Sequence, residues 1–363
     1  MIPKTMKASQ LIAYNKIEMR EVPVPQPGAG EVLCKIKAIA ICGSDPEIIN
    51  GHHSKKGWPP RFPFTVGHEW SGEVVALGDG VTGFAVGDRV AGEAHKGCGS
   101  CANCLKGRYT LCLNYGKPET GHRHYGMASP GANCEYNAYA TKAIHKIPDN
   151  LSFTHAALLD TAGVALHGIE MIGVTPGGTV AIWGPGPIGL CSMQMMKGMG
   201  AAKVIMVGRR HRLKVAGEIG ADYLIDYEKE DPVKRILEIT GGLGVDEIQE
   251  CCGADIALDQ CVASICKGGK INSVAFYKDA QVKVPPFTQF VMNELTLTGS
   301  RANPNVSEKA LRMFAAGIVK GEKMVTHTFP LESYNEALDI FSNKKDGAIK
   351  VVILPESTTG GKL

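Results

Sequence analysis

The stretch Thr179-Val-Ala-Ile-Trp-Gly184-Pro-Gly186-Pro-Ile-Gly189-Leu190 decides the fold of this chain. Its apolar start, residues 180–183, predicts a buried strand, and the Met-rich segment 190–199 predicts the helix that follows. The first glycine permits a tight turn, the second lets the backbone approach a pyrophosphate, and the third lets helix and strand pack closely. A plain turn would explain glycines alone, but this order of strand, glycines and helix predicts dinucleotide binding. The predicted contacts at the turn are Gly184, Pro185, Gly186, Pro187, Ile188 and Gly189.

Length and composition narrow the function classes. At 363 residues, 44% hydrophobic and 21% charged, the chain is expected to form two packed globular domains. Its net charge of +3 comes from scattered Lys and Arg, which gives no footprint for nucleic acid or a membrane surface. No apolar run reaches membrane-spanning length, and the first residues lack an apolar signal core. We therefore expect a cytoplasmic protein whose 12 cysteines are thiols or metal ligands.

The pattern of elements changes along the chain. Residues 1 to about 95 alternate short apolar runs with turn signals, which predicts a β-rich domain. From about residue 160, helical segments alternate with β-branched runs at 204–207, 223–225, 245–248 and 271–275. This alternation predicts a parallel sheet covered on both faces. Within it, Asp231-Pro232 predicts a helix start.

The tail is expected to return to the first domain. Residues 307–316 and 332–341 predict helices, and residues 349–354 predict a last strand. The final residues, 357–363, predict a disordered end.

Four cysteines share one short loop, with the spacing Cys98-x2-Cys101-x2-Cys104-x7-Cys112. Four thiolates suit a closed tetrahedral zinc site, which stiffens a loop that has no core of its own. A chance cluster is the alternative, but so many cysteines within fifteen residues favour structural zinc. Because no ligand position is left open, this zinc is not expected to take part in chemistry.

A second constellation is spread over the chain. Cys42, His68 and Asp160 come from separate segments, and such a set can hold zinc with one position open for a substrate oxygen. Each residue also has an ordinary explanation: a small core cysteine, a strand-end histidine, a helix cap. Spacing alone cannot bring them together, so the residues by themselves leave this site open.

Several motifs in this order resemble one known family. They are Cys42-Gly-Ser-Asp, Gly67-His-Glu-x-x-Gly72-x-Val74, Gly87-Asp-Arg-Val90, the four-cysteine lobe and Gly184-x-Gly-x-x-Gly189. Together they resemble the zinc-dependent medium-chain dehydrogenase/reductase family over nearly the whole chain. Residues 90–95 and 159–167 further resemble segments of the polyol and L-threonine dehydrogenase branch.

The resemblance implies an α/β chain with two domains. A GroES-like β-rich catalytic domain is expected over residues 1–159 and 300–363, including a structural-zinc lobe at 95–113. A Rossmann domain with a doubly wound parallel sheet is expected over residues 160–299. The family arrangement implies an active-site cleft between them.

The resemblance also assigns roles by position. Cys42, His68 and Asp160 match the catalytic zinc ligands, and Glu69 matches a carboxylate that enters or leaves the metal in this branch. Ser44 matches the hydroxyl that takes the proton from the substrate alcohol, before a hydride passes to the nicotinamide. The four-cysteine loop matches the structural-zinc ligands, so that two zinc ions per chain are implied.

Two departures from the family pattern matter. Many relatives carry a proton-relaying His where this chain has Glu47, so either Glu47 or a neighbour such as His52 is expected to relay the proton. NAD-binding relatives end the second Rossmann strand with an acidic residue, whereas here the strand ends with Gly208-Arg209-Arg210. Arginines hold a 2′-phosphate, so we favour NADP over NAD, although they could simply begin a solvated helix. Further cofactor contacts are expected at Val274, Ala275 and Phe276.

The expected substrate is a secondary alcohol flanked by polar groups: a polyol, a sugar or cyclitol, or a β-hydroxy amino acid. The residues expected to give a polar lining are Trp58, His95, His122, His124 and Arg301. Residues 116–131 carry no assignable pattern and are either a specificity loop or an ordinary surface loop. A homodimer or homotetramer is expected, with the strand near residues 295–298 as a pairing edge. The rival interpretations are a zinc-independent quinone or enoyl reductase of the same fold and a non-catalytic dinucleotide-binding protein.

Overall fold

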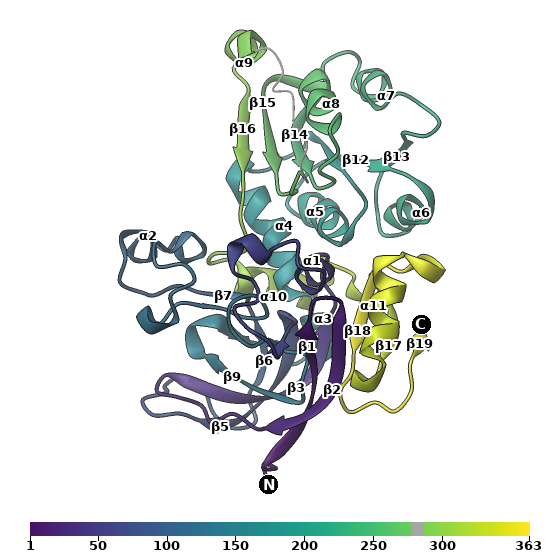
Figure 1. Cartoon of the computed structure of the whole chain (residues 1–363). Coiled ribbons are helices and arrows are strands. Elements are labelled where there is room, and N and C mark those ends of the chain that lie inside the picture. The colour runs from purple at the N-terminus through teal and green to yellow at the C-terminus, as the bar shows by residue number, and fades with distance from the viewer. Residues whose placement is uncertain (278–286) are drawn as a thin grey trace. The chain divides into compact units, whose positions relative to one another are not determined.

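The chain divides into two compact units. A computed structural model describes residues 1–277 and 287–363 (Figure 1). The first unit comprises residues 1–160, 307–315 and 325–363, and the second comprises residues 161–306 and 316–324. The expected boundaries need correction at 300–306 and 316–324, which cluster with the second unit. The reason is visible at residues 318–324: the Lys320 N–H donates to Gln194 Oε1 at 2.9 Å, and Met324 lies fully buried beside Gln194.

The first unit is built on antiparallel sheets, as the turn-rich sequence predicts. Its larger sheet has β3 and β5 at the centre, and its core contains Trp70 stacked on Tyr139 with ring centroids 4.0 Å apart. The strands of that sheet run in the order β10 (Ile144–Lys146), β6 (Arg89–Gly92), β5 (Glu69–Leu77), β3 (Glu31–Ala40), β18 (Lys350–Ile353), β17 (Val325–Phe329) and β19 (Gly361–Lys362), with β9 (Tyr136–Ala140) also paired to β3. A smaller sheet runs β2 (Lys16–Pro23), β1 (Thr5–Ala13), β4 (Phe64–Thr65), and β7 (His95–Lys96) pairs with β8 (Arg123–His124).

The first unit also contains several helices. They are α1 (Ser44–Ile49), α2 (Ala102–Leu105), α3 (Phe153–Ala156), α10 (Ser307–Ala315) and α11 (Tyr334–Ser342), and α4 (Leu159–Ile172) begins at the unit boundary. The C-terminal end corrects one expectation. Residues 357–363 are ordered in part, because β19 pairs antiparallel with β17 and its backbone bonds are thereby satisfied.

The second unit is a parallel sheet in the order β13-β12-β11-β14-β15-β16, which is the doubly wound order expected for a dinucleotide-binding fold. Its strands are β11 (Thr179–Trp183), β12 (Lys203–Gly208), β13 (Tyr223–Asp226), β14 (Val245–Glu250), β15 (Ile265–Ser273) and β16 (Thr296–Gly299). Its further helices are α5 (Pro187–Gly198), α6 (Arg210–Glu218), α7 (Pro232–Ile239), α8 (Ala257–Ser264) and α9 (Phe287–Asn293). The predicted fold class is therefore confirmed.

Local signals place several of these elements. The Asp231 carboxylate caps α7 by accepting from the backbone N–H groups of Val233 and Lys234 at 2.8 and 3.3 Å. The predicted strand at 271–275 ends earlier, at Ser273, so the expected cofactor contacts at 274–276 follow the strand rather than lie in it. Across residues 1–277 and 287–363, the structure has no helix that is both long enough and apolar enough to cross a membrane.

Candidate active site and metal centres

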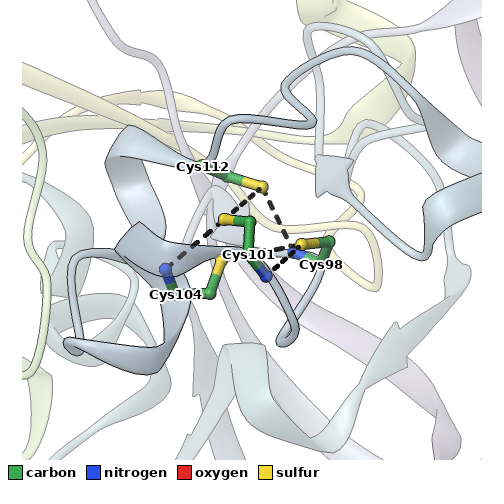
Figure 2. A group of neighbouring side chains, drawn as sticks. All are labelled: Cys98, Cys101, Cys104 and Cys112. Carbon is green, nitrogen blue, oxygen red and sulfur yellow. Dashed lines mark hydrogen bonds between the residues drawn. The ribbon is translucent and has the colours of Figure 1, made fainter.

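The four cysteines of the loop after β7 converge (Figure 2). The Sγ atoms of Cys98 and Cys104 lie 3.9 Å apart, as do those of Cys101 and Cys112. Tetrahedral zinc with bonds of about 2.3 Å sets its thiolates about 3.8 Å apart, so the spacing fits zinc and is far too long for disulfides. The structure thus brings all four predicted ligands together, and the donor set fits the metal.

Backbone N–H groups around this lobe favour thiolates. Cys98 Sγ accepts from the N–H of Cys101 and from Asn114 Nδ2, both at 3.4 Å. Backbone N–H groups, with the Asn114 amide, lower the pKa of the Cys98 thiol to about 5. Burial instead raises the pKa of Cys104 to about 12. Four thiolates in so small a volume repel one another, so a bound cation is what would keep all of them deprotonated.

A second cluster joins Cys42, His68 and Glu69, whose ligand atoms lie within 4.8 Å of one another. Cys42 follows β3 and precedes α1, while His68 and Glu69 stand at the start of β5. β3 and β5 pair antiparallel with Ala40 opposite Glu69, so the ladder register itself brings these residues together. His68 and Glu69 are buried, and this set of donors also fits zinc.

Charges around this cluster suit a cation. The Asp45 carboxylate accepts from the Cys42 N–H at 2.8 Å, and its other oxygen lies 3.4 Å from His68 Nδ1. Burial opposes charge on the His68 imidazole, but Cys42 and Asp45 outweigh burial and raise its pKa well above the usual value. The negative charges that raise this pKa would also attract a metal ion. The sequence placed Asp45 in the motif that begins at Cys42 but did not predict its contacts with Cys42 and His68.

Glu69 has a buried cationic partner that sequence reasoning missed. Lys350 in β18 is 1% exposed, and its ammonium lies 2.5 Å from Glu69 Oε2 while donating to the Ile41 carbonyl at 3.2 Å. A lone lysine in the apolar run 349–354 was the available signal, because a lysine is almost never fully buried unless paired. In this structure the Glu69 carboxylate is therefore shared between the cluster and Lys350.

Asp160 lies in the first turn of α4 and is buried. One of its carboxylate oxygens accepts from the Ala94 N–H at 3.2 Å. Burial raises the pKa of Asp160 to about 6, the His68 charge opposes that rise, and Glu69 adds to it. Asp160 is thus electrostatically linked to His68 and Glu69, although it stands outside the compact Cys42 cluster. Its role as a zinc ligand stays a prediction.

Glu47 and His52, the two alternative proton-relay residues of the sequence analysis, contact each other. Glu47 lies in α1, and its Oε2 is 2.6 Å from His52 Nδ1. The Glu47 side chain is 18% exposed and that of His52 is 62% exposed, so the pair leads from a sheltered group to a solvated one. Ser44 begins the same helix and is partly exposed.

Residues 116–119 are exposed, as expected for a surface loop, but residues 122–131 are mostly buried, which corrects that alternative for this part of the segment. Gly67 has φ +92° and its missing Cβ would lie 2.4 Å from Asn133 Oδ1, so only glycine fits there. Gly126 and Gly131 pack against the Gly67 backbone, and the Ala132 N–H donates to its carbonyl at 2.8 Å. The segment therefore fixes the strand start that carries His68.

The histidines of this segment are buried as well. β8 sets His124 opposite His95 of β7, and the two imidazoles stack with centroids 4.0 Å apart. Tyr115 lies against both rings, and Trp58 packs edge-on against His124 at 5.1 Å. Four expected lining residues, Trp58, His95, His122 and His124, thus belong to one cluster around Tyr115. Arg301 belongs to the other unit.

The glycine turn of the second unit has the geometry that a dinucleotide needs. Gly184 has φ +98°, and a Cβ at Gly189 would lie 1.9 Å from the Gly184 carbonyl oxygen. A Cβ at Gly186 would meet no protein atom within 4 Å, so open space lies where the backbone could approach a phosphate. Helix α5 begins there with Gly186 as N-cap and no side-chain cap, which leaves its first N–H groups for an anion.

The arginines after β12 have a partner that the sequence argument missed. Arg209 Nη1 lies 2.6 Å and Arg210 Nη2 3.3 Å from Glu228 Oε1. β12 itself ends without an acidic residue, as the sequence indicates, but β13 pairs with β12 and the segment after β13 brings the Glu228 carboxylate alongside the two arginines. The Arg209 and Glu228 side chains are 43% and 37% exposed, so solvent screens this ion pair and it is weak.

The expected contacts at 274–276 follow β15 at the carboxyl edge of the sheet. The Val274 N–H donates to the Glu250 carbonyl at 3.0 Å, and Val274 itself is buried. Phe276 is largely exposed, and its carbonyl oxygen packs so closely on Gly253 that a Cβ there would lie 2.8 Å from it. Parallel sheets bind ligands at this edge, so the placement is compatible with a cofactor.

Comparison with known proteins gives the family context. Residues 28–149 match the alcohol dehydrogenase GroES-like domain family, and residues 187–316 match the zinc-binding dehydrogenase family. Sorbitol dehydrogenase of Bacillus subtilis (strain 168) is 34% identical over 360 residues, which cover 98% of each chain. L-threonine 3-dehydrogenase of Bacillus licheniformis is 32% identical over 337 residues, which cover 92% of this chain and 94% of the relative.

The solved structures agree with these relatives. A protein assigned as a zinc-binding dehydrogenase of Sinorhizobium meliloti 1021, bound to NADP, superposes with a TM-score of 0.88. It is 32% identical, and the match covers 97% of this chain and 100% of that chain.

Proposed function

The chain belongs to the zinc-dependent medium-chain dehydrogenase family, in the polyol and L-threonine dehydrogenase branch, and we propose that it oxidises a polar secondary alcohol with NADP. As a member of this family it is an oxidoreductase. The observation that carries the proposal is the convergence of Cys42, His68 and Glu69 in a buried cluster, separate from the four-cysteine lobe. A zinc-independent reductase or a pure binding protein would have no need of both donor sets.

Two zinc ions per chain are proposed. The four cysteines would hold one with no open position, and Cys42, His68 and Asp160 would hold the other, with Glu69 able to replace a ligand. The contact between His68 Nδ1 and Asp45 leaves Nε2 as the nitrogen for the metal. When bound, the catalytic zinc supplies a Lewis acid for the substrate oxygen.

The chain's own residues then handle the proton. We assign Ser44 as the hydroxyl that accepts the proton of the substrate alcohol, because it stands two residues from Cys42 at the start of α1. The proton passes on through Glu47 to His52, whose contact at 2.6 Å supports a relay from a sheltered carboxylate to a solvated imidazole. This pair takes the place of the single histidine found in many relatives.

NADP is favoured by the two arginines after β12 and by the NADP-bound structural relative. The glycine turn at 184–189 would bind the pyrophosphate, and residues 274–276 would line the nicotinamide side. Glu228 competes with a 2′-phosphate for both guanidinium groups. Because that pair is partly exposed, a phosphate that accepts from both arginines should displace it.

The proposed substrate is a polyol, a sugar or cyclitol, or a β-hydroxy amino acid. The cluster of His95, His124, Tyr115 and Trp58, in which both histidines are buried, supports a polar, hydrogen-bonding wall. A cytoplasmic homodimer or homotetramer is proposed as well. β16 is an edge strand, and exposed Phe287, Val291 and Met292 on α9 are apolar side chains that a second copy would cover.

The test follows nicotinamide absorbance with NADP⁺ and, separately, NAD⁺ against polyols, cyclitols, L-threonine and simple secondary alcohols. Turnover with NADP⁺ on one polar class supports the whole proposal. Turnover only with NAD⁺ keeps the zinc mechanism and overturns the arginine argument. No turnover across the panel by the zinc-loaded protein contradicts the proposed substrate class and favours a binding role.

A further inference from the structure

A buried carboxylate outside the proposed ligand sets is hydrogen-bonded to the cysteine lobe, and the residue that follows it contacts Asp160. Glu93 is 1% exposed and lies between β6 and β7. It accepts from Tyr109 Oη at 2.7 Å, from His145 Nε2 at 2.6 Å and from Ser307 Oγ. These donors come from the cysteine lobe, from β10 and from the start of α10. A buried carboxylate with three donors is well satisfied and holds its partners firmly.

One donor ties Glu93 to the cysteine lobe. Tyr109 lies in the short helical turn Tyr109–Leu111, between Cys104 and Cys112 in the sequence. Its Cβ and the Cys104 sulfur pack so closely on Gly97 that a Cβ there would come within 2.8 and 2.6 Å of them. The lobe contributes little to the main core, but it packs in this way against the end of β7, directly after which it begins.

The next residue ties the same backbone to Asp160. The Ala94 N–H donates to Asp160 Oδ1 at 3.2 Å in a buried setting, while the Ala94 carbonyl accepts from the Tyr125 N–H. The Glu93 N–H donates to the Ala143 carbonyl at 2.8 Å. Residues 93 and 94 are therefore held by both side-chain and backbone hydrogen bonds. A shift of Glu93 would displace the Ala94 N–H, which donates to Asp160.

We propose that Glu93 is a positioning residue that couples the four-cysteine lobe to Asp160 through the Tyr109–Glu93 hydrogen bond and the Ala94 N–H. This inference rests on the proposed function, because it takes Asp160 as a ligand of the catalytic zinc. The lobe then does more than stabilise the fold: the metal it holds keeps Tyr109 in place, and Glu93 passes that constraint to the catalytic ligand.

The test compares two variants that each remove one donor from the same carboxylate. Tyr109→Phe cuts the link to the lobe, and Ser307→Ala is the matched control on the α10 side. The measurement is the rate at which the zinc-loaded protein loses its catalytic metal to a mild chelator. We expect about tenfold faster loss in Tyr109→Phe, as is typical for lost outer-sphere partners, and less than about a twofold change in Ser307→Ala. Equal rates in the two variants would overturn the proposal.

A double-mutant cycle tests the route. Cys98→Ser disrupts the lobe and should speed loss of the catalytic metal in the wild-type background, yet add little once Tyr109→Phe is present. Fully additive effects would mean that the lobe acts on the catalytic site by another path.

A second readout needs no metal. Amide hydrogen exchange of the segment 92–96 should be faster in Tyr109→Phe than in Ser307→Ala, because Glu93 loses its hydrogen bond to the lobe and no longer fixes the backbone at Ala94. If the wild-type chain binds no zinc, the proposed function fails, and hydrogen exchange still decides whether the coupling exists. Unchanged exchange in Tyr109→Phe would overturn the coupling itself.

Discussion

The two clusters of candidate metal ligands in the first unit contrast in how they are built. Four cysteines within fifteen residues make the lobe, and its geometry follows from a local loop with N–H groups turned to sulfur. Cys42, His68 and Glu69 converge because β3 and β5 pair in one register, and Asp160 is linked to His68 and Glu69 through electrostatics while its carboxylate accepts from Ala94. A local site serves stability, whereas an assembled site can leave a position open for a substrate.

Removal of a ligand from the assembled site is expected to give the largest effect. Cys42→Ser should lower turnover by about a thousandfold or more, because a Lewis acid contributes several kcal/mol to the transition state. Fold and cofactor binding should persist, which circular dichroism and nucleotide fluorescence titration would check. Near-full activity in this variant would refute the catalytic-zinc assignment.

Lys350→Met tests whether the assembled site depends on its buried counter-charge. Loss of the ammonium leaves Glu69 buried without its cationic partner, and broken buried pairs cost about 3–5 kcal/mol. Chemical denaturation should show that loss of stability. The double variant Lys350→Met/Glu69→Gln is the control, and it should recover most of the stability. A Lys350→Met protein as stable as the parent would mean that Glu69 is held by other groups.

The lobe should respond differently when one of its ligands is lost. Cys101→Ser is expected to release one zinc per chain and to lower stability by about 3 kcal/mol, or roughly 4–7 °C in Tm. Turnover of freshly prepared Cys101→Ser protein, divided by the amount of catalytic zinc that remains bound, should fall far less than the turnover of Cys42→Ser. Metal analysis gives the zinc content per chain, and calorimetry gives the change in Tm. A collapse of turnover with unchanged Tm would reverse the roles of the two centres.

The same contrast explains what the sequence could predict. The lobe, the glycine turn and the strand–helix alternation are local patterns, and the structure has all of them. Lys350 beside Glu69 and Glu228 beside Arg209 join residues from separate strands, and no spacing rule relates them. The burial of His122 and His124 could not be predicted for the same reason, because it depends on packing against β7 and Tyr115. Resemblance supplied the ligand assignments that the residues alone left open.

The proton route is a local pair at the edge of the assembled site. Glu47→Gln should lower turnover by about a hundredfold, the low end of the range for a lost acid–base group, and should change the pH profile of turnover. His52→Asn removes only the solvated end and should cost less, with partial rescue by added imidazole. His53→Asn, the neighbouring histidine that packs on Trp58, is the matched control. Equal effects at His52 and His53 would argue against the relay.

The smallest effect is expected at the cofactor edge, where the arginines are local in sequence but Glu228 arrives from the next strand. Glu228→Gln frees both guanidinium groups and should tighten NADP⁺ binding about threefold, in keeping with the modest worth of exposed ion pairs. NAD⁺ binding should not change, since NAD⁺ has no 2′-phosphate for the arginines to hold. Glu230→Gln, on a carboxylate two residues further along that lies near Arg235 instead, is the matched control. Calorimetric titration of both nucleotides separates the outcomes. Equal tightening of NADP⁺ and NAD⁺ would show that Glu228 acts on the general charge of this edge, and weaker NADP⁺ binding would show that the carboxylate holds the arginines in the conformation that binds phosphate.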